Sequence, residues 1–371
     1  ITGHHSAVRA DVVDGVADRA DLFGLFVGDL GLELFFHRHD QLDDVEGVRV
    51  EVLHEVGING HLAPVHPEAA ASMAAAAGGF CVVEVDRFSG QRNRRDDRLS
   101  ELAQRLIGCE AAIAVNNNAA ACVLALTTFA KGKQTITSRG ELVEIGGSFR
   151  MPDVMEQAGT KLVGVGATNR TRIGDYQKAI NDETGLLLKV HRSNFAVIGF
   201  TEEVEMEDIA SLAKAHGLPS VYDLGAGFLN NGVPGLTTIE GLVGETLLDD
   251  AIQSGADVVS FSGDKLFGGP QAGILAGNAG AIEDMRKNPL YRAMRLDKVG
   301  LAGLERTFKL YLEGRGDEIP ARALLRRKPA ELRQAAEQLF AQLKDQPIIQ
   351  ADGCSLEIGR ASCRERVFRA V

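Results

Sequence analysis

The chain has 371 residues, 45% of them hydrophobic, and a formal net charge of −11. This length allows one large domain and a smaller one, and the charge does not indicate a general nucleic-acid-binding protein. No apolar run is long enough to cross a bilayer and no signal peptide is recognisable, so we expect no membrane partner. The five cysteines lack paired or metal-type spacing, which predicts no metal site and suits a reducing cytoplasm; they are Cys81, Cys109, Cys122, Cys354 and Cys363.

Residues 1–60 differ in composition from the rest of the chain. They contain twelve Asp or Glu, four Arg and no Lys, and so carry −8 of the net charge. Their alternating apolar and polar residues, as in Asp43–Leu53, are strand-like. Two explanations stay open: a divergent small domain, or translation of the wrong frame or strand upstream of the coding sequence. We favour the second and expect residues 1–62 to be an atypical segment foreign to the native protein.

A basic loop follows the first clear helix of the chain, which we expect over residues 67–77. The loop spans Ser89–Asp97, runs into a predicted helix over 99–107, and contains Arg92, Arg94 and Arg95. Exposed arginines are usually only a solvated surface. On a loop beside glycine they also suit the capture of an anion.

A run of three asparagines, Asn116–Asn118, separates a short buried strand over 111–115 from a helix that reaches Ala130. A strand, a small polar turn and a helix start present free backbone N–H groups to a phosphate. An ordinary N-cap would explain one asparagine easily, but three in a row less well.

The chain then alternates short apolar strands with helices up to residue 276. This pattern predicts an α/β fold with a mainly parallel sheet and helices on both faces. Ligands bind such sheets at the carboxyl ends of the strands. The polar residues expected at that edge are Asn116–Asn118, Arg139, Asn169, His191, Asp223 and Lys265.

Lys265 and Asp223 are the two candidates for chemistry. Lys265 lies in a glycine-rich turn after a buried strand, where desolvation can turn a lysine into an amine nucleophile that forms a Schiff base with a carbonyl cofactor. Asp223 follows the apolar pair Val221 and Tyr222, and a carboxylate there can pair with a protonated pyridine nitrogen. A surface lysine in a hairpin and a turn aspartate are the plainer alternatives.

The last third of the chain is less regular. We expect a loop over Asn288–Lys298 with Arg292 and Arg295 three residues apart, and an amphipathic helix over 299–312. A further helix over 329–343 opens a smaller C-terminal domain. Residues 357–367 have no helical or strand period, and we expect 357–371 to be a foreign tail.

The central motifs are long and specific, and with them the chain resembles bacterial L-seryl-tRNA(Sec) selenium transferase, or selenocysteine synthase. The resemblance covers residues 63 to about 355, and it is carried by NNNAAA (Asn116–Ala121), SRGELVEIGGSFRMPD (Ser138–Asp153), GATNR (Gly166–Arg170), SGDKLFGGPQAG (Ser262–Gly273) and RAMRLDK (Arg292–Lys298). It implies a pyridoxal 5'-phosphate (PLP) enzyme of the fold-type-I, aminotransferase-like architecture.

The resemblance also implies roles for individual residues. Lys265 would carry the cofactor, Asp223 would pair with its ring nitrogen, and Asn117, Asn118, Ala119 and Ser262 would complete the cofactor site. The anionic selenophosphate and the tRNA end would meet six arginines: Arg92, Arg94, Arg95, Arg139, Arg292 and Arg295. No metal is implied.

The implied reaction converts L-seryl-tRNA(Sec) to L-selenocysteinyl-tRNA(Sec) through an aminoacrylyl intermediate, in a cytoplasmic homo-oligomer of dimers. The family's basic N-terminal tRNA-binding domain and its entry motif are missing from residues 1–62. We therefore expect a catalytic domain over 63–313, the start of a truncated small α+β domain over 314–356, and weak tRNA binding.

Two rival functions remain open. A related PLP lyase that acts on a small amino acid or an amino sugar phosphate would need the same lysine, aspartate and phosphate turn. A non-catalytic remnant that binds RNA or a partner would not need both Lys265 and Asp223.

Overall fold

The computed structural model describes residues 63–328, apart from 86–88, 146–148, 231–232, 234 and 240–244. It also describes four helical positions between 330 and 338, and three strands outside the range 63–328. The chain divides into two compact units, Ala63–Ala323 and a second unit made of Ile1–Leu62 with Leu324–Val371. Most of the expected C-terminal domain, including the helix expected over 329–343, lies outside the described residues. Within the described part, no helix is long and apolar enough to span a membrane.

The described residues of the second unit include a three-stranded sheet. Strands β1 (Glu33–His37) and β2 (Arg49–Leu53) are antiparallel, and β12 (Ser355–Gly359) pairs with β2 in parallel. The prediction that the tail has no strand period is wrong for its first three residues, because β12 covers them. Leu356 and Ile358 alternate with polar or small neighbours, and this short period-two pattern is enough for a strand.

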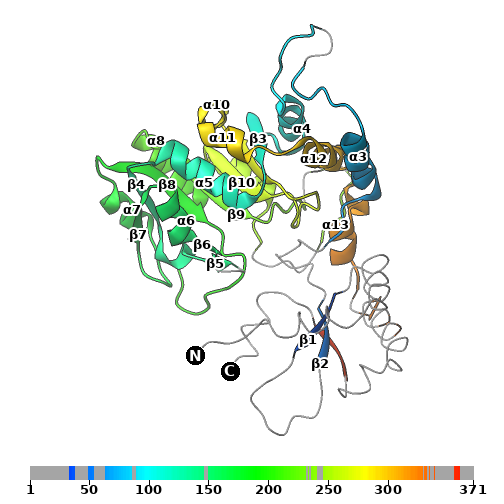
Figure 1. The fold of residues 1–371 in the computed structure, drawn as a ribbon. Helices are drawn as coiled ribbons and strands as arrows, with labels where there is room; N and C mark the ends of the chain where they lie inside the picture. The colour runs from blue at the N-terminus through cyan, green and yellow to red at the C-terminus, as the bar shows by residue number, and fades with distance from the viewer. Residues whose placement is uncertain are drawn as a thin grey trace, which may run out of the picture. The chain divides into compact units, whose positions relative to one another are not determined.

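The first unit is built on a seven-stranded sheet in the order β3-β11-β10-β9-β8-β4-β7 (Figure 1). Only β11 runs against its neighbours, and the paired strands β10, β9, β8, β4 and β7 are all parallel. The mainly parallel sheet of the sequence prediction is therefore confirmed. The strands are β3 (Ala111–Val115), β4 (Gln134–Ser138), β7 (Lys161–Val165), β8 (Thr184–Val190), β9 (Ser220–Gly225), β10 (Val258–Ser262) and β11 (Gly273–Gly277).

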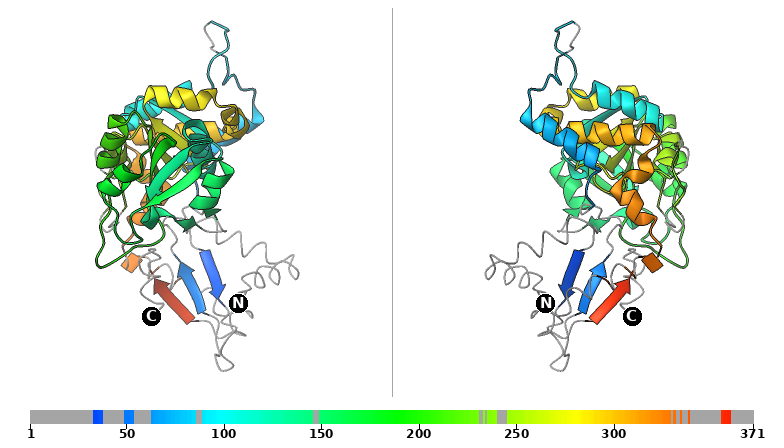
Figure 2. Two further views of the ribbon diagram at one scale, coloured as in Figure 1. Left: turned by 90° about the vertical axis from the view of Figure 1, so that its left-hand side faces the viewer. Right: turned by 90° about the vertical axis from the view of Figure 1, so that its right-hand side faces the viewer.

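Helices cover both faces of this sheet, and each face has its own apolar core (Figure 2). One core lies under α5 (Asn118–Phe129), α6 (Met151–Gln157), α10 (Ala279–Lys287) and α11 (Pro289–Met294). The other lies under α4 (Asp97–Ile107), α7 (Ile173–Ala179), α8 (Met206–Ala215), α9 (Leu248–Gln253) and α12 (Lys298–Leu312). Because both faces are covered, the strands are near-continuous apolar runs rather than alternating ones.

Helix α11 corrects the loop that the sequence predicted over Asn288–Lys298. Asn288 caps the helix by accepting a hydrogen bond from the Leu290 N–H at 3.0 Å, and Pro289 occupies the first helical position. An Asn followed by Pro is a strong helix start, and it outweighs the polar composition of the segment. The remaining short elements are 3-10 turns η3 (Arg139–Glu141) and η4 (Gly316–Glu318), the hairpin β5 (Glu144–Ile145) with β6 (Phe149–Arg150), and α13 (Pro320–Leu325).

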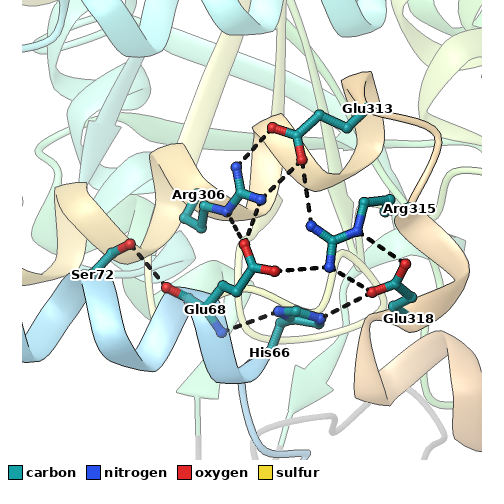
Figure 3. A network of polar contacts seen from close by, with 7 residues as sticks. All are labelled: His66, Glu68, Ser72, Arg306, Glu313, Arg315 and Glu318. Atoms are coloured by element: carbon teal, nitrogen blue, oxygen red, sulfur yellow. Dashed lines mark hydrogen bonds and ion pairs between the residues drawn. The ribbon is translucent and has the colours of Figure 1, made fainter.

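An ion-pair network ties α3 (Pro67–Gly78) to the C-terminal end of α12 (Figure 3). Glu68 accepts hydrogen bonds from Arg306 at 2.9 Å and from Arg315 at 2.8 Å. Arg306 also binds Glu313, and Arg315 also binds Glu318. Hydrogen bonds from Arg315 and Arg306 lower the pKa of Glu68 to about 2.

Glu68→Gln is expected to lower Tm only slightly, by about 2 °C, because the network is exposed and screened by salt. The lowered pKa of Glu68 means that the stabilisation is fully present above pH 4.5, its ordinary pKa, and is lost as the pH falls towards about 2. Thermal melts of both proteins at several pH values and salt concentrations test this. A Tm difference that persists in high salt would contradict it.

Candidate active site

Asp223 is the centre of a buried polar cluster in β9. Its Oδ1 atom accepts hydrogen bonds from Asn118 Nδ2 at 2.8 Å and from Ser260 Oγ at 2.9 Å. Its Oδ2 atom accepts a hydrogen bond from the Cys122 thiol at 3.3 Å. Asp223 is 6% exposed, so hydrogen bonds from three protein side chains replace the water that would solvate this carboxylate.

The backbone periodicities explain why these side chains meet. Side chains two apart on a strand share a face, so Asp223 faces the same way as Val221, which belongs to the core under α5. Ser260 lies beside Asp223 in the sheet, in register on the parallel strand β10. Asn118 and Cys122 are four apart on α5, and this spacing places both on one side of the helix.

The surroundings of Asp223 on this face are apolar. A small cavity beside the carboxylate is lined by Cys122 together with Ala125, Leu126, Met151, Leu186, Leu188 and Val221. Burial, followed by the nearby negative charge of Asp223, raises the pKa of the Cys122 thiol well above its ordinary value, and the positive charge of Lys265 opposes this rise. The thiol is therefore protonated and acts as a donor, and the Lys265 amine lies within electrostatic reach of the cluster.

The expected phosphate turn is the N-terminus of α5. Asn117 is the N-cap, and its side chain accepts a hydrogen bond from the Ala120 N–H at 2.9 Å. The N–H groups of Asn118 and Ala119, in the first turn, have no partner inside the helix. The strand β11 passes very close below this turn, and a Cβ on Gly273 would lie 2.1 Å from the Asn117 carbonyl oxygen. Only glycine fits there.

Lys265 lies in a tight turn directly after β10 and is 6% exposed. The Gly268 N–H donates to the Lys265 carbonyl at 2.9 Å, and Gly268 has a φ of +74°. A Cβ at Gly268 would lie 2.4 Å from Ile319, so the turn needs glycine both for its backbone angle and for its packing. Ser262 ends β10 and is 4% exposed. The turn thus holds the lysine at the carboxyl edge of the sheet, directly after the strand that neighbours β9.

Three of the six arginines converge on one carboxylate, that of Glu84. Arg295 and Arg95 lie 3.1 and 3.5 Å from Glu84 Oε1, and Arg92 lies 3.5 Å from Oε2. Arg295 also forms an isolated bridge with Val115, the last residue of β3, next to the phosphate turn. The Nε atom of Arg95 is buried without a hydrogen-bond partner, which leaves a donor available.

The other three arginines lie elsewhere. Arg94 pairs with Glu283 of α10 at 3.1 Å, and Arg292 is exposed on α11. Arg139 follows β4 and donates to the Gly166 carbonyl. Because β4 is five strand positions from β3, Arg139 lies about 24 Å from Arg295 along the sheet. The six arginines therefore do not form a single cluster within one chain.

A buried ion pair supports the loop that carries Arg139. Glu141 Oε1 lies 3.5 Å from the Lys189 amine, and Glu141 Oε2 accepts a hydrogen bond from the Val190 N–H at 3.0 Å. Burial raises the pKa of Glu141, and Lys189 opposes the rise. The residue directly after β8, His191, donates its N–H to the Asp223 carbonyl at 2.9 Å. The pair thus fixes backbone that contacts Asp223.

Sequence reasoning missed three members of this site: Cys122, Ser260 and Glu84. The spacing of Cys122 from Asn118 on a predicted helix was a usable signal, as was the spacing of Ser260 from Ser262 on a strand. For Glu84 the nearby arginines of the basic loop, Arg92 and Arg95, were a usable signal, but its third partner, Arg295, is remote in sequence. Within the part of the chain that the structure describes, no group of three or more His, Cys, Asp or Glu could hold a metal ion.

Comparisons with known proteins agree with this architecture. Residues 52–366 match the family model described as L-seryl-tRNA selenium transferase, a match that starts before residue 63 and ends after residue 355. L-seryl-tRNA(Sec) selenium transferases from Carboxydothermus hydrogenoformans and Mannheimia succiniciproducens are 46% and 47% identical to this chain, each over 76% of it. The protein of the same name from Aquifex aeolicus is 48% identical over 73% of the chain.

Solved structures with a similar fold are more distant in sequence. The structure of D-glucosaminate-6-phosphate ammonia-lyase has a TM-score of 0.58 and 22% identity, and the match covers 76% of this chain and 70% of that one. A structure of SPT with PLP has a TM-score of 0.51 and 15% identity over 97% of this chain and 82% of that one. These matches confirm the fold-type-I architecture that the sequence predicted.

The chain spans about three fifths of the length of the curated relatives it matches: 59% of the Carboxydothermus protein and 60% of the Mannheimia protein. The family match, over residues 52–366, nevertheless includes all seven strands of the large sheet. From the family match and these relatives, the chain belongs to the L-seryl-tRNA selenium transferase family.

Proposed function

We propose that this chain contains the catalytic centre that converts L-seryl-tRNA(Sec) to L-selenocysteinyl-tRNA(Sec), with selenophosphate as the selenium donor and PLP as the cofactor. The single observation that carries the proposal is the placement of Lys265 and Asp223. Both are buried at the carboxyl ends of neighbouring strands: Asp223 near the end of β9, where it binds Asn118 of α5, and Lys265 in the turn after β10. Membership of the family then favours the seryl group on a tRNA as the substrate.

The residues present fit three polar groups of PLP: its phosphate, its ring nitrogen and its aldehyde. The free N–H groups at the start of α5 suit a phosphate dianion. The Asp223 carboxylate suits a protonated pyridine nitrogen, and the Lys265 amine suits the aldehyde. Asn118 Oδ1 is buried without a hydrogen-bond partner, so the pocket has an acceptor still available to a bound group.

Each of the two central residues has a separate task in this proposal. PLP, when bound, supplies an electron sink for the electrons of a broken Cα–H bond. Lys265, once released from the cofactor, accepts the proton from the substrate Cα as a general base. Asp223 holds the compensating negative charge next to the ring, and its three donors keep that charge in place.

The arginine cluster around Glu84 supports an anionic second substrate. Arg92, Arg95 and Arg295 bring three positive charges to one carboxylate, which leaves the cluster with excess positive charge. Arginine binds phosphate-type oxygens through its planar fork of donors. Selenophosphate carries such oxygens, and the cluster lies beside the strand that leads into the phosphate turn.

Glu84→Gln is expected to strengthen the binding of inorganic phosphate to the PLP-loaded protein about fivefold, because Glu84 competes with the anion for the arginines and an exposed ion pair contributes up to about 1 kcal/mol. Titration calorimetry of both proteins measures this. The PLP-loaded form is used because its own phosphate already fills the site at α5.

Glu313→Gln is the matched control for this variant. Glu313 also binds two arginines, but it follows the far end of α12, a helix of fifteen residues and about 22 Å in length. Removal of its charge should leave phosphate affinity unchanged. Equal effects of the two variants would mean that only net charge matters, and weaker binding in Glu84→Gln would show that Glu84 organises the arginines rather than competing for them.

We further propose a homo-oligomer of dimers in the cytoplasm, where aminoacylated tRNA is available. Large apolar side chains that are exposed on the described surface support an interface: Phe80, Val82, Val85, Ile198 and Phe200. Phe80, Val82 and Val85 are near one another in sequence, as are Ile198 and Phe200, and a contiguous exposed apolar patch marks a contact with another chain. Sedimentation analysis of the purified protein gives the stoichiometry.

The proposed function is tested with seryl-tRNA(Sec), radiolabelled selenophosphate and the PLP-loaded protein. We expect label to enter the aminoacyl group of the tRNA, and free L-serine to be a poor substrate. Turnover of D-glucosaminate 6-phosphate or of free amino acids, without label in tRNA, would instead favour the lyase function. Absence of any PLP binding would favour a non-catalytic role.

A further inference from the structure

We propose that Cys122 is a positioning residue of the catalytic centre: its thiol donates to Asp223 and keeps this carboxylate ionised against the pyridine ring of the cofactor. The inference rests on the proposed PLP site, but not on the identity of the substrate. Cys122 acts through Asp223 and not on the reacting atoms.

The two oxygens of Asp223 are not equally supplied with donors. Oδ1 has two, Asn118 and Ser260, at 2.8 and 2.9 Å. For Oδ2 the described residues provide one, the Cys122 thiol at 3.3 Å. The apolar cavity that Asp223 and Cys122 share offers no other polar side chain. Loss of the thiol would therefore leave Oδ2 without a side-chain donor on this face.

The consequence for the ring is a shift in where one proton resides. With a bound pyridine ring, the proton lies either on the ring nitrogen, opposite a carboxylate anion, or on Asp223, opposite a neutral ring. Hydrogen bonds to the carboxylate anion favour the first arrangement. Each of these hydrogen bonds is stronger beside the apolar cavity, because the local dielectric constant there is low. Removal of the Cys122 donor shifts the equilibrium towards the second arrangement. The total charge of the ring and Asp223 is the same in both arrangements, but the neutral ring is a poorer electron sink.

The position favours a protonated thiol over a thiolate. Burial and the neighbouring carboxylate raise the pKa of Cys122, so the thiol is protonated and acts as a donor at neutral pH. The thiol also fills apolar space beside Ala125 and Leu126, which a hydroxyl would fill less well. Cysteine thus combines a donor with an apolar volume at this point.

Three substitutions separate the donor from the volume. Cys122→Ser keeps a donor and loses volume, Cys122→Val keeps volume and loses the donor, and Cys122→Ala loses both. Each variant is loaded with PLP that carries ¹⁵N in the ring, and the nitrogen chemical shift is followed by NMR as a function of pH. This readout reports the ring proton directly and requires neither tRNA nor selenophosphate.

In the Val and Ala variants we expect a smaller protonated fraction of the ring nitrogen than in the parent near neutral pH. The ratio of the two arrangements should change about tenfold, since one hydrogen bond to the charged form of Asp223 is removed. The Ser variant should match the parent. A Val variant that matches the parent while Ser does not would show that Cys122 only fills space, and would overturn the proposal. Equal shifts in all four proteins would overturn it as well.

A failure of the proposed function would look different. If the chain binds PLP but does not act on seryl-tRNA(Sec), the ¹⁵N chemical shift of the Ser variant should still match that of the parent, and those of the Val and Ala variants should still differ from it. If a variant binds PLP too weakly for NMR, the dissociation constant of PLP takes the place of the chemical shift: we expect weaker binding for Val and Ala, and binding close to that of the parent for Ser. The reverse order would contradict the role of the donor.

Discussion

Replacing Lys265 by alanine is expected to abolish the covalent attachment of PLP and to lower kcat by about 10³-fold or more, since the substitution removes both the attachment point and the general base. Lys265 is 6% exposed and follows β10 in a turn fixed by Gly268. Its loss leaves the strand and the turn backbone intact, so folding should be preserved. Borohydride reduction of the PLP-loaded parent, followed by peptide mapping, should place the label on Lys265.

Lys265→Arg is the control that separates charge from chemistry. It keeps a positive charge near the Asp223 cluster but cannot act as the amine nucleophile, so we expect it to be as inactive as the alanine variant. Recovery of activity in the arginine variant would show that only the charge is needed. Label found on Lys298, whose amine binds the Gly79 carbonyl at 3.0 Å, would rule out Lys265 as the attachment point.

The edge of the sheet that holds the site could be predicted because its signals are local. A short apolar run followed by a small polar or glycine-rich turn identifies each parallel strand and its carboxyl end. Parallel pairing then brings those ends together without any knowledge of side-chain contacts. Asn118, Asp223 and Lys265, which are far apart in the sequence, could be expected at one edge on this basis alone.

Contacts between remote segments could not be predicted in the same way. Glu84 meets Arg295 across more than two hundred residues, and nothing in the spacing of either one selects the other. The role of Cys122 depends on the rotation of α5 against β9, which is set by packing in the core under that helix. The pattern shows which face of a helix is apolar, but not which strand residue lies beneath a given turn.

The helix at Pro289–Met294 shows a different limit of the sequence prediction. It begins with proline and has only six residues, which are too few for a clear helical period. The capping residue Asn288 decides the local structure, and packing of Leu290 and Met294 against the core fixes it. Because Arg295 comes directly after this helix, the error in the prediction also hid the place of that arginine beside β3.

Asp223→Asn is expected to leave the fold intact and PLP bound but to lower kcat by roughly 10²–10³-fold, because a neutral amide does not stabilise a protonated ring nitrogen and a neutral ring is a poorer electron sink. The amide can keep most of the existing contacts. Its oxygen can accept from Asn118 and Ser260, and its NH₂ group can face the sulfur of Cys122, a weak acceptor. The loss is therefore one of charge, not of packing.

Asp257→Asn is the matched control for this change. Asp257 lies at the opposite edge of the same sheet, where it accepts hydrogen bonds at 2.9 Å from both the N–H and the hydroxyl of Ser220. Loss of its charge should reduce Tm but leave kcat within about twofold, because it is remote from the ring. If the kcat of Asp223→Asn equals that of Asp257→Asn, then Asp223 only organises the buried cluster. If instead kcat falls only in Asp223→Asn while the Kd of PLP changes little, the carboxylate acts in the chemical step.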